Sequence, residues 1–231
     1  MKKILLVRPP SSYGENIRGF QLDIPLGLLY IASVLENNGY QVEVFDARID
    51  FNNSKLLNTY QNRQFVEKYW ISKLKKVIQK KNPDVVGITN QFSAQIFNAI
   101  RVSEVAKEVN RNILTIVGGP HASVSPQSFL KLSNAVDIVA IGEGEYVVLD
   151  ILDANKNKRS LETIDGIAFR NSSGEIVINK TRAPILNLDD LPYPAYHLIN
   201  LEKYFKAQEL GFEVRGRYNY PGAERAIPMI T

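Results

Sequence analysis

The chain has 231 residues, 45% of them hydrophobic, which is enough for one full α/β domain and a smaller appendage. It has no cysteine, which excludes disulfides, thiol chemistry and cysteine-bound metals within it, and we expect a cytoplasmic location. The formal net charge is +4, but the lysines concentrate between Lys68 and Lys81, where a solvated helix face is favoured over a nucleic-acid partner. A membrane partner is not expected, because no run of about 18 apolar residues occurs.

The first part of the chain alternates apolar runs with segments of helical periodicity. Apolar strands are expected at 3–7, 41–47, 84–89, 113–119 and 136–142. A buried helix is expected at 26–35, amphipathic helices at 65–78 and 96–109, a short helix in or near 126–132, and another helix at 143–154. This alternation predicts right-handed crossovers and a parallel sheet that is buried on both faces. Five such units indicate an α/β, doubly wound, five-stranded parallel sheet of flavodoxin-like order.

The pattern changes after residue 157. Residues 166–180 read as a β-hairpin whose turn is Asn171–Gly174, and the proline-rich stretch after it reads as an extended linker. No clear element is expected from Tyr204 onward, and the chain ends in a strand-like run, IPMIT, as if cut inside a strand. We therefore predict an α/β binding domain at 1–157, and at 158–231 a hairpin and linker that lead to a further domain.

The loops after the strands are the candidate binding site, because ligands of open parallel sheets bind outside the carboxyl ends of the strands. Their glycines let the main chain approach a flat ligand, and their hydroxyls and amides suit a neutral ligand rich in amides. The two glutamates would favour a helix dipole, which explains them without a ligand and argues against a bare phosphate there. The candidate cofactor-binding residues are Pro9, Pro10, Ser11, Thr89, Asn90, Gln91, Phe92, Gly118, Gly119, Pro120, His121, Gly142, Glu143, Gly144 and Glu145.

Three common functions of such sheets do not fit these loops. A dinucleotide site needs GxGxxG after the first strand, where this chain has RPPSSYG, although Asp46 does follow the second strand. A phosphoacceptor domain needs acids where Arg8 and Thr89 stand. A flavodoxin-type phosphate loop is excluded by the two prolines after Arg8.

His121 is one of two histidines and has two readings. Its imidazole could ligate a metal or transfer a proton. We favour a loop histidine that is hydrogen-bonded near the ligand, because Gly118 and Gly119 already explain the motif. We predict no catalytic residue and no metal ligand in this chain.

Several motifs in order resemble one family. They are RPP near the start, then IPLGLLYIASVLENNGYQVEVFDA, PDVVGIT, IVGGPHAS and DIVAIGEGE. Together they resemble the cobalamin-binding domain at the amino end of cobalamin-dependent radical SAM enzymes, over about residues 1–155. The hairpin and the LDDLPYPAYHLI linker are similar to the connector of those proteins. In the family, an IPMIT-like sequence precedes a CxxxCxxC motif that holds a [4Fe–4S] cluster, so the chain looks like the amino-terminal piece of such an enzyme.

The resemblance implies that a corrin lies over the carboxyl edge of the sheet, with its nucleotide tail beside the loops after Arg8, Thr89, Gly118 and Gly142. It implies a base-off cobalamin without a histidine ligand, because the chain lacks DxHxxG. It also implies a methyl relay from S-adenosylmethionine (SAM) through cobalamin to a small-molecule substrate. The cluster, the SAM and the radical step would belong to a C-terminal radical SAM domain, without which this chain is not expected to be active. The alternative is a docking or substrate-recognition module that has lost the cofactor, with Phe92 intruding into its site.

Overall fold

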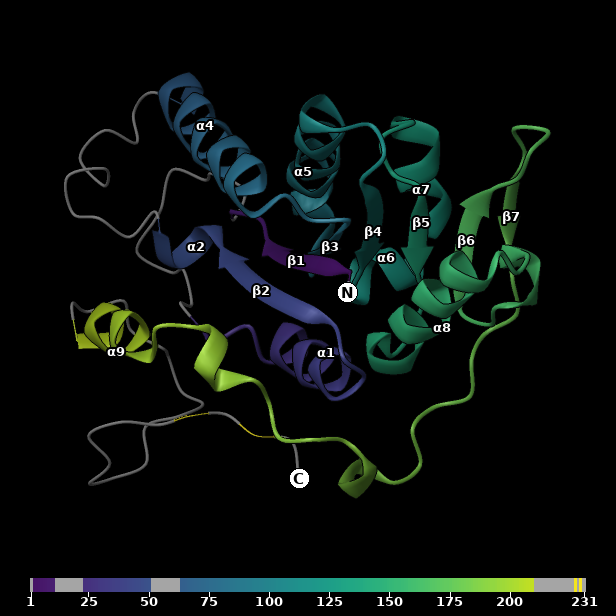
Figure 1. Ribbon diagram of the computed structural model, residues 1–231. Helices are drawn as coiled ribbons and strands as arrows, with labels where there is room; N and C mark the ends of the chain where they lie inside the picture. The colour runs from purple at the N-terminus through teal and green to yellow at the C-terminus, as the bar shows by residue number, and fades with distance from the viewer. Residues whose placement is uncertain (1, 11–22, 51–62, 210–226, 228, 230–231) are drawn as a thin grey trace.

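One seven-stranded sheet organises the chain in the computed structural model, which describes residues 2–10, 23–50, 63–209, 227 and 229 (Figure 1). The strand order is β2-β1-β3-β4-β5-β6-β7. The parallel strands are β1 (Lys3–Arg8), β2 (Gln41–Asp46), β3 (Val85–Thr89), β4 (Leu114–Gly118) and β5 (Ile138–Ala140). The antiparallel strands are β6 (Ile167–Arg170) and β7 (Ile176–Ile178). The predicted α/β class is confirmed.

The sheet differs from the expectation of five strands in that the hairpin extends it. β6 pairs antiparallel with β5, so that Ile138 lies opposite Phe169 and Ala140 opposite Ile167. The amide of Ile141 also donates to the carbonyl of Gly166 at 2.8 Å. Without β6, the backbone groups along this edge of β5 would lack partners, which explains why the hairpin joins the sheet rather than standing apart.

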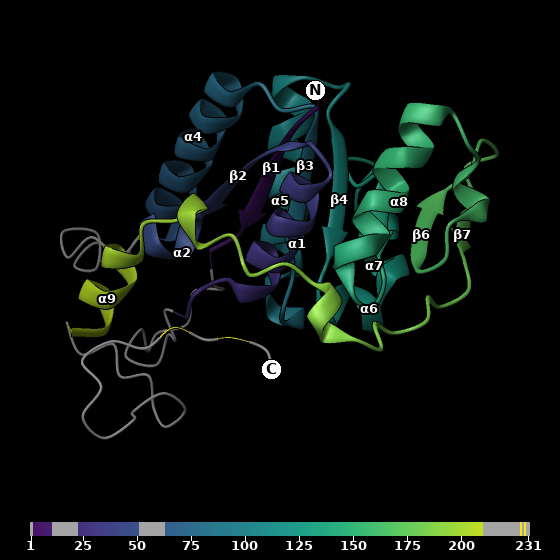
Figure 2. The same ribbon diagram turned by 60° about the horizontal axis from the view of Figure 1, so that its bottom comes forward.

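Helices cover both faces of the sheet (Figures 1 and 2). One face carries α4 (Arg63–Lys81), α5 (Ile96–Val109), α6 (Pro120–Val124) and α7 (Pro126–Leu132), and the other carries α1 (Leu26–Asn37) and α8 (Gly144–Asn157). The remaining described helices are α2 (Ala47–Asp50) and α9 (Leu201–Glu209), with short 3₁₀ turns at Ser93–Gln95, Leu161–Thr163, Leu188–Asp190 and Tyr196–Leu198.

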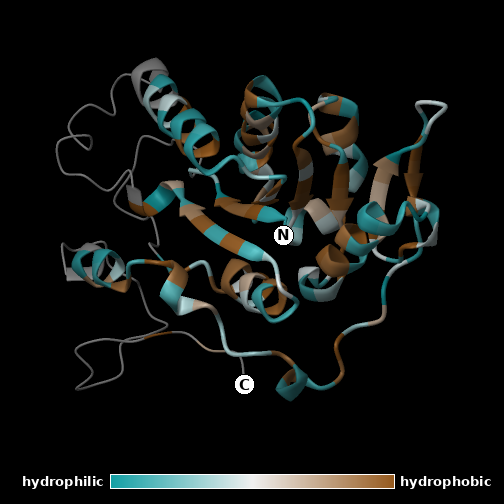
Figure 3. Cartoon of the chain, in the orientation of Figure 1, coloured by the Kyte–Doolittle hydropathy of each residue, from teal (hydrophilic) through white to brown (hydrophobic). Residues whose placement is uncertain are grey.

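Two buried cores follow from the alternation along the strands. Leu5 and Val7 of β1 point into the core under α4 and α5, whereas Ile4 and Leu6 point into the core under α1 and α8. Trp70 of α4 is 1% exposed and belongs to the first core. The strands are accordingly hydrophobic along most of their length, while the helices carry polar residues on their outer sides (Figure 3).

The segment after β7 runs across the outside of α8 and α1 before it forms α9 (Figures 1 and 2). The amide of Ala195 donates to the carbonyl of Leu29 at 3.1 Å, which attaches this segment to α1. α9 lies in a stretch for which no element was expected. Tyr204 of α9 is 1% exposed and shares a small core with Ile24 and Leu29, so tertiary packing stabilises a helix whose sequence alone gives a weak signal.

Candidate functional site

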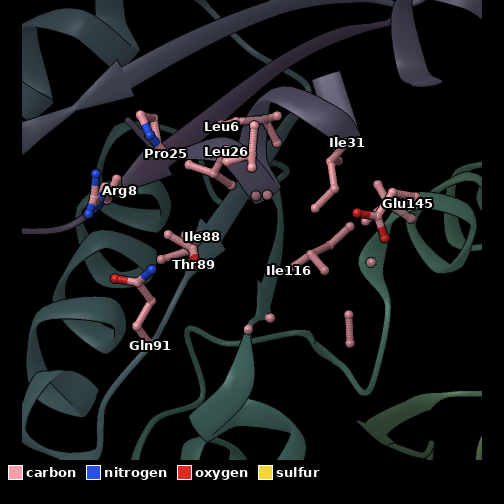
Figure 4. A pocket seen from close by; sticks show the side chains of 18 of the residues that line it. Leu6, Arg8, Pro25, Leu26, Ile31, Ile88, Thr89, Gln91, Ile116 and Glu145 are labelled. Carbon is pink, nitrogen blue, oxygen red and sulfur yellow. The ribbon is translucent and has the colours of Figure 1, made fainter. Parts of the chain in front are cut away.

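A pocket of about 400 Å³ opens at the carboxyl edge of the parallel strands, between α1 and α8 (Figure 4). On this side of the sheet, β3, β4 and β5 carry small residues at Gly87, Gly118 and Ala140, which leave space above the strands. Its lining consists of Ile4, Leu6, Arg8, Asp23, Ile24, Pro25, Leu26, Gly27, Leu28, Ile31, Val85, Gly87, Ile88, Thr89, Gln91, Ile116, Gly118, Gly119, Pro120, Ala140, Gly142, Glu143, Gly144, Glu145 and Val148.

The floor of the pocket is apolar and depends on a glycine. Ile4, Leu6, Val85 and Ile116 form it from three adjacent strands. A Cβ on Gly87 would lie 2.7 Å from Cδ2 of Leu6, so any side chain there would displace Leu6 and fill the floor. An elongated ligand could therefore enter along the strands, with its apolar part at the bottom and its polar part near the loops.

The loops after β3 and β4 are locked together at the rim. The amide of Asn90 donates to the carbonyl of Gly118 at 2.7 Å, and the amide of His121 donates to the carbonyl of Asn90 at 3.3 Å. Gly119 has a φ of 105°, and a Cβ there would lie 2.7 Å from the carbonyl oxygen of Asn90. Only glycine fits this position, and the rim therefore presents bare backbone toward the pocket.

A buried group of charges forms one end of the pocket, where Arg8 ends β1. Nη2 of Arg8 is 2.5 Å from Oδ1 of Asp23, and Nη1 is 3.4 Å from Oδ2 of Asp46. Burial opposes the charge of Arg8, but the carboxylates of Asp46 and Asp23 outweigh it and raise the pKa of Arg8 above its ordinary value. Arg48 lies beside this group, and burial and the charge of Arg8 lower its pKa to about 10.

Two glutamates form the opposite end, so that Arg8 and Glu145 face each other across the pocket (Figure 4). Oε2 of Glu143 accepts a hydrogen bond from the amide of Ile185 at 2.5 Å, which ties the segment after β7 to the rim. Burial, with a contribution from the charge of Glu143, raises the pKa of Glu145 above its ordinary value. This end of the pocket can thus accept hydrogen bonds from a ligand.

Nine of the fifteen residues expected in the site line this one pocket. They are Thr89, Gln91, Gly118, Gly119, Pro120, Gly142, Glu143, Gly144 and Glu145.

The other six expected residues lie elsewhere. Pro9 and Pro10 are buried, and Ser11 is outside the described residues. Asn90 is fully buried, and within the described part of the chain neither atom of its side-chain amide has a hydrogen-bond partner. Phe92 is 62% exposed, away from the pocket lining. His121 is half-buried with its Nδ1 atom 3.1 Å from Oγ of Ser93, outside the lining.

Sequence reasoning missed the wall that precedes and begins α1. This wall consists of residues 23–28, which line the pocket from that side. The sequence contains an apolar helix segment at 26–35 and an arginine, Arg8, at the end of an apolar strand, but neither by itself shows that the start of α1 faces the pocket.

The described residues contain no group of three or more His, Asp or Glu side chains that could hold a metal ion. Both histidines stand apart from the pocket lining, and Nε2 of His197 is 3.0 Å from a carboxylate oxygen of Glu36 on the outside of α1. In the described part of the chain, no helix is long and apolar enough to cross a membrane. The pocket thus combines an apolar floor, a rim of backbone at Gly118 and Gly119, and charged side chains at its two ends.

A search of protein families matches residues 22–152 to the model described as the B12 binding domain. Among curated proteins, the chain is similar to an uncharacterized methyltransferase of Pyrococcus horikoshii, with 32% identity over 92% of this chain and 42% of the relative. It is also similar to the cytidylyl-2-hydroxyethylphosphonate methyltransferase of Streptomyces wedmorensis, with 31% identity over 94% of this chain and 44% of the relative. The chain thus spans less than half the length of these relatives.

Among solved structures, the fold is similar to that of the cobalamin-dependent S-adenosylmethionine radical enzyme OxsB with aqua-cobalamin and S-adenosylmethionine bound. The TM-score is 0.69 at 18% identity, over 90% of this chain and 26% of the other. At this identity the likeness concerns the fold.

Proposed function

This chain belongs to the B12-binding domain family, and from that premise we propose that it is the cobalamin-carrying part of a longer radical SAM enzyme, a methyltransferase. The methyltransferase relatives, and the fold shared with a cobalamin-dependent radical enzyme, support the proposed reaction class. A [4Fe–4S] cluster and SAM would be held outside this chain, which has no cysteine to ligate a cluster.

The observation that carries the proposal is the glycine-bordered pocket at the carboxyl edge of the sheet. Its volume of about 400 Å³ suits the nucleotide tail of the cofactor, while the corrin ring would lie outside it, over the rim. Gly119 has a positive φ, and a Cβ on it would lie 2.7 Å from the carbonyl oxygen of Asn90, so this part of the rim is a backbone cradle that a Cβ would disrupt. Cobalamin combines a flat macrocycle rimmed with amides and a nucleotide tail, which fits a polar glycine rim above an apolar floor.

The residues that would hold the cofactor divide between rim and floor. Thr89, Gln91 and the backbone of Gly118 and Gly119 would bind polar groups at the rim, and the apolar strand residues around Gly87 would contact the tail. When bound, the cofactor supplies a cobalt centre that can accept and donate a methyl group. The protein's own contribution is to orient it over the sheet edge and to exclude water from its tail.

We further propose that the cobalamin is bound base-off and without a histidine ligand. Neither His121 nor His197 lines the pocket, and each has a polar partner outside it: Ser93 for His121 and Glu36 for His197. The competing function, a docking or substrate-recognition module without cofactor, would need a bulky side chain over the glycine rim. Phe92, the candidate for that role, is outside the pocket lining.

The test is to mix the purified chain with hydroxocobalamin, remove free cofactor by gel filtration and record the visible spectrum of the protein fraction. We expect the wild-type chain to retain the corrinoid, with the spectrum of a base-off form. Gly118→Leu is the blocking variant, because Gly118 lies beside Ala140 in the pocket lining and a larger side chain would enter the pocket. It should lose retention at an unchanged melting temperature.

Val124→Leu is the matched control, because Val124 is 83% exposed on α6 and lies outside the pocket lining. Equal retention by Gly118→Leu and by Val124→Leu would place the corrinoid elsewhere. A folded wild-type chain that retains none, even when fused to its downstream domain, would favour the docking module.

A further inference from the structure

A buried hydrogen bond joins the last described helix to the end of β2, across most of the chain. Oη of Tyr204 in α9 donates to Oδ2 of Asp46 at 2.8 Å. Tyr204 is 1% exposed and Asp46 is 5% exposed, so water does not replace this bond. A hydrogen bond to a buried carboxylate is among the stronger ones in proteins, because its loss leaves a charge less well compensated.

Asp46 also contacts Arg8, a residue of the pocket lining. The same Oδ2 atom lies 3.4 Å from Nη1 of Arg8, and Oδ1 accepts from the amide of Arg48 at 2.9 Å. The two oxygens of Asp46 are thus held by β1, by α9 and by the backbone amide two residues further along the chain. Arg8 itself lines the pocket.

Arg8 in turn holds the wall that begins α1. Nη1 donates to the carbonyl of Asp23 and Nη2 to its carboxylate, both at 2.5 Å. Asp23 is followed directly by Ile24, Pro25 and Leu26, which line the pocket. The side chain of Tyr204 also packs in one cluster with Ile24 and Leu29. α9 is therefore connected to this wall both by apolar packing and by the hydrogen bonds through Asp46 and Arg8.

From this chain of contacts we infer that Tyr204 is a positioning residue: through Asp46 and Arg8 it fixes the 23–28 wall of the pocket, so that α9 and this wall are ordered together. The inference rests on the proposed function in one respect, namely that the ligand which the wall would contact is cobalamin. The coupling itself concerns only residues of this chain. Binding in the pocket would then order α9. Through α9, it would also change how a domain attached after this helix is held.

The experiment is amide hydrogen exchange on the whole chain, with and without hydroxocobalamin, for the wild type, Tyr204→Phe and Tyr193→Phe. Tyr204→Phe removes only the hydroxyl group. Tyr193 is 83% exposed in the segment before α9, so Tyr193→Phe is the same change at a solvent-exposed site. Without cofactor, we expect Tyr204→Phe to accelerate exchange at 24–29 by roughly three- to tenfold, as the loss of one buried hydrogen bond implies. Tyr193→Phe should change nothing there.

With hydroxocobalamin, we expect exchange at 201–206 to slow in the wild type and in Tyr193→Phe, and this slowing to disappear in Tyr204→Phe. Exchange in β4 reports global unfolding, which also breaks this bond, so it should accelerate by no more than the same factor in Tyr204→Phe and stay unchanged in Tyr193→Phe. The inference is overturned if Tyr204→Phe leaves exchange at 24–29 at the wild-type rate, or if hydroxocobalamin slows exchange at 201–206 in Tyr204→Phe as much as in the wild type. If the wild type binds no corrinoid and Tyr204→Phe still accelerates exchange at 24–29 in the absence of cofactor, the proposed function is contradicted and the coupling is established.

Discussion

Gly119 and Asn90 lie so close that a Cβ on Gly119 would come within 2.7 Å of the carbonyl oxygen of Asn90. Gly119 also has a φ of 105° and a ψ of 176°, a region of backbone space open almost only to glycine. We therefore predict that Gly119→Ala lowers the free energy of unfolding by about 2–4 kcal/mol, from backbone strain together with the clash. Urea unfolding followed by circular dichroism measures this loss.

Gly118→Ala is the matched control for that prediction. A Cβ on Gly118 would lie 3.5 Å from Cβ of Ala140, which is an ordinary contact. Its effect on the free energy of unfolding should stay below about 1 kcal/mol. A loss in Gly119→Ala that also stays below about 1 kcal/mol would mean that the rim tolerates a side chain at residue 119 and is not a fixed backbone cradle.

How far the sequence could predict this site is illustrated by the two halves of the rim. The loops after β3, β4 and β5 follow directly from strand periodicity, because parallel strands bring their carboxyl ends to one edge. The wall at 23–28 does not, since nothing local shows that the start of α1 faces the pocket rather than the core. The bond from Tyr204 to Asp46 joins residues 158 positions apart and depends on the path of the segment between them. His121 is a candidate from the sequence because imidazole can ligate a metal or transfer a proton. In the structure its ring contacts Phe129 and Ser93 and lies outside the pocket lining.

The buried charges at Arg8 give a second prediction. Asp46→Ala should lower the free energy of unfolding by about 3–5 kcal/mol, because it leaves the guanidinium of Arg8 buried with Asp23 as its remaining carboxylate. It also removes the acceptor of the Tyr204 hydroxyl. Chemical denaturation at neutral pH measures the change.

An exposed ion pair provides the comparison for Asp46→Ala. Glu108 lies 2.9 Å from Nη1 of Arg101 and 3.3 Å from Nζ of Lys75, but its side chain is 41% exposed. Glu108→Gln should therefore cost less than about 1 kcal/mol. A loss at Asp46 no larger than the loss at Glu108 would show that the Arg8 group is solvated rather than buried.

The histidines give a third prediction, which concerns cobalt ligation. If the chain holds cobalamin without a histidine ligand, His121→Ala and His197→Ala should both leave the visible spectrum of the bound cofactor unchanged. After reduction to the Co(II) state, the paramagnetic resonance spectrum should show no nitrogen hyperfine splitting from a protein imidazole. A spectral shift in His121→Ala alone would identify His121 as a ligand and contradict the base-off, histidine-free assignment.

The last prediction concerns Glu145 and pH. Burial, with the charge of Glu143, raises the pKa of Glu145 above its ordinary value of 4.5, although its own backbone amide opposes the shift. The folded chain therefore keeps this proton to a higher pH than the unfolded chain does. It follows that the contribution of Glu145 to the free energy of unfolding falls as pH rises from 4.5 through the raised pKa.

Glu145→Gln removes this titration, so the variant should gain stability relative to wild type as pH rises across that window. Urea midpoints of both proteins, measured at steps from acidic to neutral pH, give this difference directly. A constant difference between Glu145→Gln and wild type at every pH would mean that the carboxyl of Glu145 is solvated, and that this end of the pocket is open to water.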